Sequence, residues 1–282
     1  MDDATASSPS DLDDWQLGRR INLRGRKKVV LAAGMLSRSG EALHQFDGFV
    51  RYLESNFGYT RGDVLEVSYS SAPEGDDWRP TPYDAHHSHA SLRDVSAQAG
   101  RTLRWYRALL PDDTEYHLIG YSLGGVALFE AAGALLLGEP ERWRGRLGSL
   151  TTLSAPLFGA DLGLEGELLG ALGFGALFSG GDSVRELLAR GRNPNHRALV
   201  ERLAARLRAA GVRVMTLADA NDVVVTPEDA IIAPPGERDR HVLSGPRVPG
   251  AGLGLGHGQI LSNTLAWVRM AKQIGPQEPR AS

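Results

Sequence analysis

The 282-residue chain contains no cysteine, which excludes disulfide bonds, thiolate metal sites and a cysteine nucleophile. It also lacks any run of about 18 apolar residues, so the sequence predicts no transmembrane helix. The formal charge is only −3, with 31 basic against 34 acidic residues, and this balance gives no sign of binding to nucleic acid or to an anionic membrane. What is present is a globular composition, because 42% of the residues are hydrophobic and this is enough for one sizeable core.

The first 14 residues, MDDATASSPSDLDD, are acidic and polar. Ser, Asp and Pro dominate there and little can be buried, so residues 1–14 are expected to be a disordered tail. The stretch has no basic region followed by an apolar one, so no signal peptide is expected and the sequence predicts a cytoplasmic protein. Residues 15–282 are expected to form a single domain, since one domain of this length is ordinary.

Segments typical of strands and of helices alternate along the chain. The expected strands are 28–33, 63–69, 115–119, 147–153 and 212–217, with a short one at 241–243. The expected helices are 41–57, 92–110, 125–132, 196–210 and 259–272. The first strand, KVVLAA, is almost wholly apolar, which is typical of a parallel sheet covered on both sides. The pattern predicts an α/β fold: an open, mostly parallel sheet with helices on both faces and ligands at the carboxyl ends of its strands.

The most informative stretch is GYSLG at 120–124. It follows a run of β-formers at 115–119 and precedes an apolar segment at 125–132 that is typical of a buried helix. Strand, G-x-S-x-G and helix in this order are the context of a nucleophile elbow, in which a sharp turn lifts the serine hydroxyl off the sheet. Glycines two positions either side of the serine allow strand and helix to approach closely, and the first N–H groups of the helix would point at the reacting centre. Ser122 is therefore the candidate nucleophile.

A serine hydroxyl is a weak nucleophile, so it needs a base within hydrogen-bond reach and an acid that orients the base. In this context the chain order is Ser, then Asp or Glu, then His. Asp222 lies in the loop after the strand at 212–217 and is favoured as the acid, while Asp219 at the strand edge stays open as the alternative. His257 is favoured over His241 as the base, because it lies between glycines at a helix start, where a loop-borne ring can reach the nucleophile.

Two backbone N–H groups are expected to form an oxyanion hole. One is that of Leu123, directly after the nucleophile, and the other is that of Met35, in the loop after the first expected strand. Gly34 would let the backbone there bend toward a substrate. The chemistry that these residues suit needs no cofactor and no metal ion.

Two long segments carry further signals. Residues 70–90 are expected to be a loop near the mouth of the site, and their HHSH cluster at 86–89 is not expected to bind metal, because no nearby acid or cysteine completes a ligand set. Residues 157–194 are rich in Gly and Leu and are interpreted as a helical lid over an apolar acyl pocket. The alternative for that segment is helices packed into the core or against a second copy in a homo-oligomer.

Several stretches resemble motifs of the α/β-hydrolase superfamily, in its lipase and esterase branch. GYSLGG at 120–125 resembles G-H-S-x-G-G, with Tyr121 where histidine is common. VLAAGM at 30–35 resembles the oxyanion strand V-L-V-H-G-x, with Ala33 in place of the usual histidine. SAPLFG at 154–159, DVVVTP at 222–227 and GHG at 256–258 resemble the family's S-P-H-x-G turn, D-G-V-V-P acid loop and final G-H turn.

The resemblance spans about residues 28–272 and implies an α/β-hydrolase fold and ester hydrolysis through an acyl-enzyme. The expected substrate is a carboxylic ester with a lipophilic acyl chain. Acyl transfer or thioester cleavage by the same three side chains stays the nearest alternative. An inactive module that binds a small molecule is the alternative from a different class.

Overall fold

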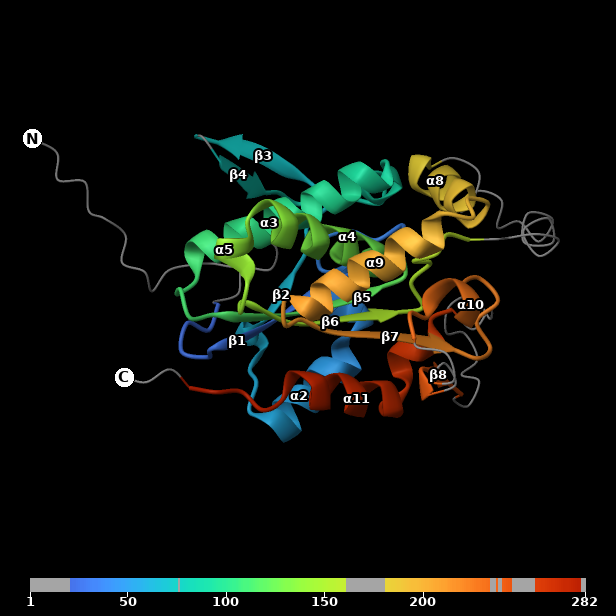
Figure 1. Cartoon of the computed structure of the whole chain (residues 1–282). Coiled ribbons are helices and arrows are strands. Elements are labelled where there is room, and N and C mark those ends of the chain that lie inside the picture. The colour runs from blue at the N-terminus through green and yellow to red at the C-terminus, as the bar shows by residue number, and fades with distance from the viewer. Residues whose placement is uncertain are drawn as a thin grey trace, which may run out of the picture.

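The computed structural model describes residues 21–75, 77–160, 181–233, 237, 240–244 and 257–279 (Figure 1). The acidic tail expected at 1–14 lies outside these residues. None of the helices in the described part of the chain is both long and apolar enough to span a bilayer.

Within the described ranges, one six-stranded sheet has the order β2-β1-β5-β6-β7-β8, and every neighbouring pair in it is parallel. Its strands are β1 (Lys27–Ala32), β2 (Val64–Glu66), β5 (Glu115–Tyr121), β6 (Leu147–Leu153), β7 (Arg213–Asp219) and β8 (Val242–Leu243). The expected mostly parallel sheet is therefore confirmed. Because all strands run the same way, the carboxyl ends of β1, β5 and β7 lie at one edge of the sheet.

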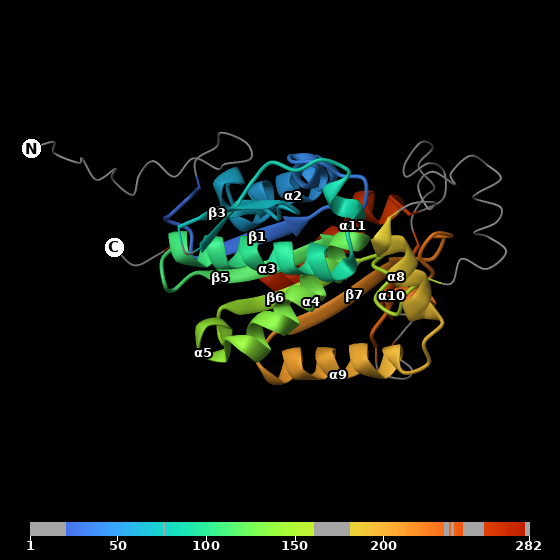
Figure 2. The same cartoon turned by 90° about the horizontal axis from the view of Figure 1, so that it is seen from above.

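Helices cover both faces of the sheet (Figures 1 and 2). One face is covered by α3 (Leu92–Leu109), α4 (Leu123–Gly138) and α9 (His196–Ala209), and the other by α1 (Glu41–Gln45), α2 (Asp47–Phe57) and α11 (Thr264–Ile274). A hydrophobic core lies on each face of the sheet. Successive residues of β1 point to opposite faces, so Val30 packs against the helices of the first face and Val29 against those of the second. This is why the strand is apolar at successive positions rather than at every second one.

The structure differs from the expected elements in several places. The helix expected at 259–272 is a 3-10 helix at 259–262 followed by α11, which Asn263 caps by accepting the N–H groups of Leu265 and Ala266. The helix expected at 41–57 is interrupted at Phe46, where the backbone leaves helical geometry and the buried ring packs into the core between α1 and α2. The loop expected at 70–90 contains an antiparallel hairpin, β3 (Ser71–Glu74) and β4 (Asp77–Pro80), and a short 3-10 helix, η3 (His87–His89). Prolines in both strands made this region resemble a loop, but the hairpin is separate from the main sheet and can accept proline on its unpaired edges.

The remaining described elements are short. They are η2 (Arg61–Asp63), α5 (Pro140–Trp143), α8 (Asp182–Gly191), α10 (Pro227–Ala230) and η7 (Gln259–Ser262). The middle of the segment interpreted as a lid, residues 161–180, lies outside the described residues, and the lid stays a prediction. The described parts of that segment are 157–160 and 181–194, and the latter contains α8, which contacts η3 and α3.

Candidate active site

The turn from β5 to α4 has the geometry that the G-x-S-x-G spacing predicts. Ser122 has φ 53° and ψ −126°, a strained conformation for a residue with a side chain, and α4 begins at the next residue. The N–H of Ser122 donates to the carbonyl of Leu153 in β6 at 2.9 Å, and the carbonyl of Ser122 accepts from Gly125 at 3.0 Å. These bonds hold the turn at the edge of the sheet, so the strain is maintained by the surrounding structure.

Two glycines explain why this sequence can make so sharp a turn. A Cβ on Gly120 would lie 2.4 Å from the carbonyl oxygen of Gly124, and a Cβ on Gly124 would lie 2.4 Å from that of Ala32. Both distances are too short for any side chain, and the clashing atoms are backbone that cannot turn away. The helix therefore packs directly on the ends of β5 and β1 only because both positions lack side chains.

Ser122, His257 and Asp222 form a continuous chain of hydrogen bonds. The Nε2 atom of His257 lies 2.8 Å from Oγ of Ser122, and its Nδ1 atom lies 2.8 Å from Oδ2 of Asp222. An ionised Asp222 can only accept, so Nδ1 carries the proton and Nε2 is left to accept from the serine hydroxyl. The structure thus brings together three of the side chains singled out in the sequence, with the imidazole oriented to take a proton from the serine.

The acid is held firmly by its own loop. The side chain of Asp222 is buried, and its second oxygen, Oδ1, accepts the backbone N–H groups of Val224 at 3.0 Å and Val225 at 2.9 Å. These two bonds leave Oδ2 facing the imidazole. Asp219, the alternative acid, is buried at the end of β7 and accepts the backbone N–H of Asn221 at 2.8 Å, so within the described chain it bonds to its own loop and not to His257.

Tyr121 is a site residue whose role the sequence did not reveal. Its ring centroid lies 5.0 Å from that of His257 at an interplanar angle of 38°, so it packs against the imidazole. Burial, and then the charge of Asp222, raise the pKa of Tyr121 far above its usual range, so the phenol stays neutral beside the site. The motif marked this position only as a departure from histidine, and the contact depends on a ring 136 residues further along the chain.

The two backbone groups expected to form the oxyanion hole lie on either side of Ser122. Leu123 is the first residue of α4, and Gly34, just before Met35, is so close to the turn that a Cβ on it would lie 3.2 Å from Cβ of Ser122. Among the residues that the structure describes, the N–H groups of Met35 and Leu123 donate to no other protein atom. The positive end of the α4 dipole adds to the attraction of negative charge at this point.

The histidine cluster at 86–89 lies beside the loop of Met35, because Oγ of Ser88 accepts the N–H of Leu36 at 2.9 Å. His87 pairs with Asp84 at 2.9 Å, and the cluster lines a cavity of about 670 Å³ together with Tyr69, Asp94 and Arg185. In the described ranges, no group of three His, Asp or Glu side chains is arranged to hold a metal ion.

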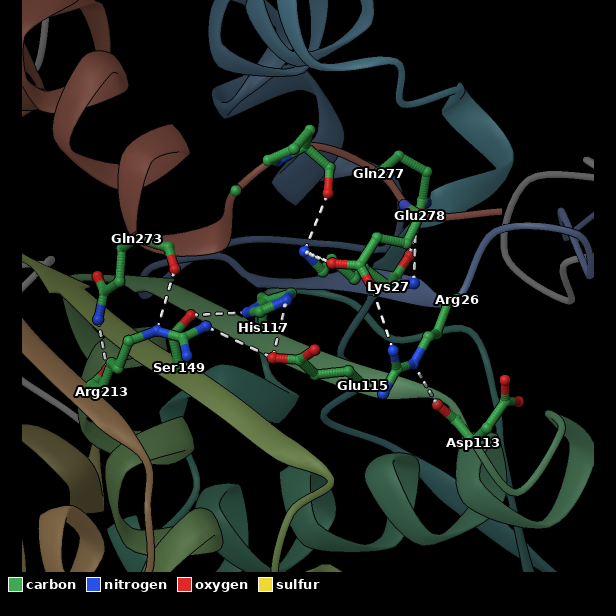
Figure 3. A network of polar contacts seen from close by, with 12 residues as sticks. Arg26, Lys27, Asp113, Glu115, His117, Ser149, Arg213, Gln273, Gln277 and Glu278 are labelled. Carbon is green, nitrogen blue, oxygen red and sulfur yellow. Dashed lines mark hydrogen bonds and ion pairs between the residues drawn. The ribbon is translucent and has the colours of Figure 1, made fainter. Parts of the chain in front are cut away.

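Two other histidines contact protein groups away from the site. His117, on β5, is buried at the opposite end of the strand and bonds to Ser149 at 2.9 Å (Figure 3). Burial, and then the charges of Arg213 and Lys27, lower its pKa to about 3. His241, the alternative base, bonds to the carbonyl of Thr216 at 2.8 Å beside β8.

Comparison with known proteins gives likeness of fold only. No family model and no curated protein matches the chain. Among solved structures, the propeptide form of the lipase BlEst2 from Bacillus licheniformis has a TM-score of 0.53 at 17% identity, covering 94% of this chain and 53% of that one. Its mature form has a TM-score of 0.49 at 15% identity, covering 91% of this chain and 94% of that one.

The phospholipase PlaB from Legionella pneumophila is also similar, with a TM-score of 0.46 at 16% identity. The match covers 68% of this chain and 37% of that one, so the chain spans little more than a third of that protein's length. The likeness to BlEst2, together with the sheet order and helix layers, shows that the chain has the α/β-hydrolase fold. The fold expected from the sequence motifs is therefore confirmed.

Proposed function

We propose that the chain is a serine hydrolase that cleaves carboxylic esters through an acyl-enzyme on Ser122. The observation that carries the proposal is the pair of 2.8 Å contacts that join Ser122 to His257 and His257 to Asp222. The strained turn supports it further, because it presents the serine hydroxyl beside the N-terminus of α4. The lipase BlEst2, whose fold the chain shares, is consistent with chemistry of this class.

In the acylation step, Nε2 of His257 takes the proton of Ser122 as Oγ attacks the ester carbonyl carbon. The carbonyl π electrons move to oxygen, and the N–H groups of Met35 and Leu123 donate to the resulting oxyanion. The tetrahedral intermediate then expels the alkoxide, which takes the proton from His257 and leaves as the alcohol. Asp222 stays ionised and stabilises the imidazolium that exists between the two proton transfers.

Deacylation repeats these steps with water in place of serine. His257 takes a proton from a water molecule as the water oxygen attacks the acyl carbon, and the same two N–H groups hold the second oxyanion. Collapse of this intermediate returns the proton to Oγ of Ser122 and releases the carboxylic acid. The proposed cycle uses no cofactor and no metal ion.

We further propose that the acyl chain is lipophilic. Leu36, next to Met35, is 40% exposed, and Val223, next to Asp222, is 42% exposed. Both lie on loops at the carboxyl edge of the sheet, so apolar surface is presented on either side of the catalytic residues. An apolar acyl group would cover that surface on binding.

A chemical test separates this proposal from its alternatives. A fluorophosphonate probe is expected to label Ser122, and p-nitrophenyl esters from acetyl to palmitoyl are expected to be hydrolysed faster as the acyl chain lengthens toward medium length. Absence of both labelling and turnover would refute the hydrolase and favour an inactive binding module. Preference for a thioester, or transfer of the acyl group to an added alcohol in place of water, would favour thioesterase or acyltransferase activity.

A further inference from the structure

The loop that carries Met35 is held by two buried side chains, one on each side of the proposed oxyanion donor. The donor is the N–H of the Gly34–Met35 peptide. The peptide before it is held by the hydroxyl of Tyr69, which donates to the carbonyl of Ala33 at 2.6 Å. The peptide after it is held by Ser88, whose Oγ accepts the N–H of Leu36 at 2.9 Å. Both neighbours of the donor peptide are therefore fixed, while its own N–H is left uncommitted in the described chain.

Tyr69 is suited to a fixed donor role. Its side chain is buried, and its ring meets that of Tyr83 edge-on with centroids 5.1 Å apart, which fixes the direction of the hydroxyl. Burial, and then the neighbouring phenol of Tyr83, raise the pKa of Tyr69 well above its usual range. The phenol therefore keeps its proton at neutral pH and donates it to the carbonyl of Ala33.

Ser88 is suited to accept. It is fully buried in η3, and its hydroxyl proton is donated to the carbonyl of Ala85 at 2.9 Å, which directs a lone pair at the N–H of Leu36. Leu36 itself has φ 63°, in the left-handed region that residues with side chains seldom adopt. A strained residue of this kind persists only where its surroundings hold it, and the hydrogen bond from the N–H of Leu36 to Oγ of Ser88 holds this one.

The carboxyl-terminal end of the Met35 loop is held by Tyr83, which belongs to the same segment as Ser88, between β4 and α3. The N–H of Ser39 donates to the carbonyl of Tyr83 at 3.0 Å, and the N–H of Tyr83 donates to Oγ of Ser39 at 2.8 Å. The hydroxyls of Ser37 and Tyr83 lie 3.3 Å apart. With the loop fixed before and after it, the Gly34–Met35 peptide keeps only rotation about the line between its two Cα atoms, so its N–H is largely pre-oriented before substrate binds.

We propose that Tyr69 and Ser88 are positioning residues that orient the Met35 N–H for the oxyanion, an inference that rests on the proposed hydrolase function. Their hydroxyls bond to the loop backbone at Ala33 and Leu36 and to none of the three catalytic side chains. They act through the peptides on either side of the donor. The polar segment between β4 and α3 thus has a role in the chemistry, although it contributes none of its side chains to the catalytic chain of hydrogen bonds.

The test removes each hydroxyl with little change of shape, by Tyr69→Phe and Ser88→Ala. Each variant is expected to lower kcat roughly 10- to 100-fold while KM changes little, because the oxyanion exists only after attack and misplacement of its donor weakens the transition state. Affinity for a trifluoromethyl ketone, which forms a tetrahedral oxyanion with the nucleophile, is expected to fall by a similar factor. Binding of the unreactive alcohol analogue is expected to stay unchanged.

Matched controls come from the opposite end of the sheet. Tyr59 is a buried tyrosine whose hydroxyl donates to the carbonyl of Gly275 at 3.2 Å, and Ser149 is a buried serine bonded to His117. Tyr59→Phe and Ser149→Ala are expected to lower thermal stability about as much as the two loop variants, with kcat unchanged. Stability loss alone therefore does not account for a fall in kcat that is confined to the loop variants.

The inference is overturned if Tyr69→Phe and Ser88→Ala keep the kcat of their controls, or if substrate and trifluoromethyl ketone lose affinity equally. Failure of the proposed function has a different signature. If Ser122→Ala retains turnover, the reaction does not pass through an acyl-enzyme on Ser122 and the proposed hydrolase function is wrong. If Ser122→Ala is inactive while both loop variants keep full kcat, only the positioning role is wrong.

Discussion

The two ends of β5 carry the same three kinds of side chain in contact. At the carboxyl end, His257 lies between Ser122 and Asp222, with both contacts at 2.8 Å. At the amino end, His117 lies 2.9 Å from Ser149 and 3.6 Å from a carboxylate oxygen of Glu115 (Figure 3). Residue types alone therefore do not distinguish a candidate active site from a structural network.

The surroundings of the two histidines are what differ. The side chain of His117 is 0% exposed and that of His257 is 14% exposed, so only His257 can meet a substrate. Ser149 lies within β6 and pairs with His117 and Arg213, just after a register shift in the β5–β6 ladder, whereas Ser122 occupies the strained turn beside the N-terminus of α4. Access and nearby backbone N–H donors, rather than a Ser–His–acid set, are what make nucleophilic chemistry feasible.

The carboxylates differ in the same way. Glu115 also pairs with Arg213 at 3.4 Å, and the separate ion pairs of Arg26 and Lys27 with Glu278 belong to the same network of polar contacts (Figure 3). Among the described residues, Asp222 pairs with His257 and with no Lys or Arg. A carboxylate that is already paired with an arginine stabilises an imidazolium less strongly.

The largest expected effect comes from removing each serine in turn. Ser122→Ala is expected to lower kcat roughly 10⁵- to 10⁶-fold, since no other group can form the acyl-enzyme. Ser149→Ala is expected to leave kcat unchanged and to cost about 1–3 kcal/mol of stability, because Nδ1 of His117 loses its partner. Ester turnover and thermal unfolding of both variants measure this contrast. Turnover that depends on Ser149 as strongly as on Ser122 would contradict it.

The next largest effect separates the two candidate acids. Asp222→Asn is expected to lower kcat about 10³- to 10⁴-fold, because an amide in place of the carboxylate favours the wrong tautomer of His257. Asp219→Asn is expected to leave kcat close to that of the unaltered chain, since Asp219 bonds to its own loop. Steady-state kinetics with one ester measure both, and thermal unfolding controls for loss of fold. A larger fall in kcat for Asp219→Asn than for Asp222→Asn would reverse the assignment.

The smallest expected effect is the change of folding stability with pH that arises from His117, near the amino end of β5. Burial lowers the pKa of His117 from its ordinary 6.5 to about 3, so between these values the unfolded chain binds a proton that the folded chain does not. The stability contributed by neutral His117 is therefore fully present above pH 6.5 and is lost progressively as pH falls toward 3. At pH 5 the loss is about 2 kcal/mol.

Urea unfolding between pH 7 and 5 measures this loss. His117→Gln, which cannot titrate but can still bond to Ser149, is expected to flatten the dependence in that range. The positive charges of Arg213 and Lys27, which also oppose protonation of His117, remain in the variant. An equally steep fall of stability in the variant would show that the pH dependence arises from other groups and not from His117.

Much of the molecule could be read from the sequence because the signals are local. The apolar run in β1 and the spacing of Gly120, Ser122 and Gly124 depend on backbone sterics and burial within a few residues. The break at Phe46 and the hairpin β3–β4 were missed, because a buried ring and a free strand edge are decided by distant neighbours. The pattern of residues within a short segment does not show which distant residues will pack against it.

The site shows the same division. The sequence singled out Ser122, Asp222 and His257, but it left Asp219 open and could not place Tyr121 against the imidazole. It also could not show that Tyr69 and Ser88 hold the loop around Met35, since each bond joins residues more than 30 positions apart. Such bonds exist only once the strands are aligned.

By itself, the sequence determined the parallel sheet, the sharp turn at Ser122 and a short choice of partners, because strand periodicity and glycine sterics act over a few residues. The tertiary structure alone decided which acid meets His257, which histidine stays buried and neutral, and which side chains bond to the loop of Met35. The physical reason is that hydrogen bonds and desolvation depend on distances of a few ångströms between residues that the chain separates widely.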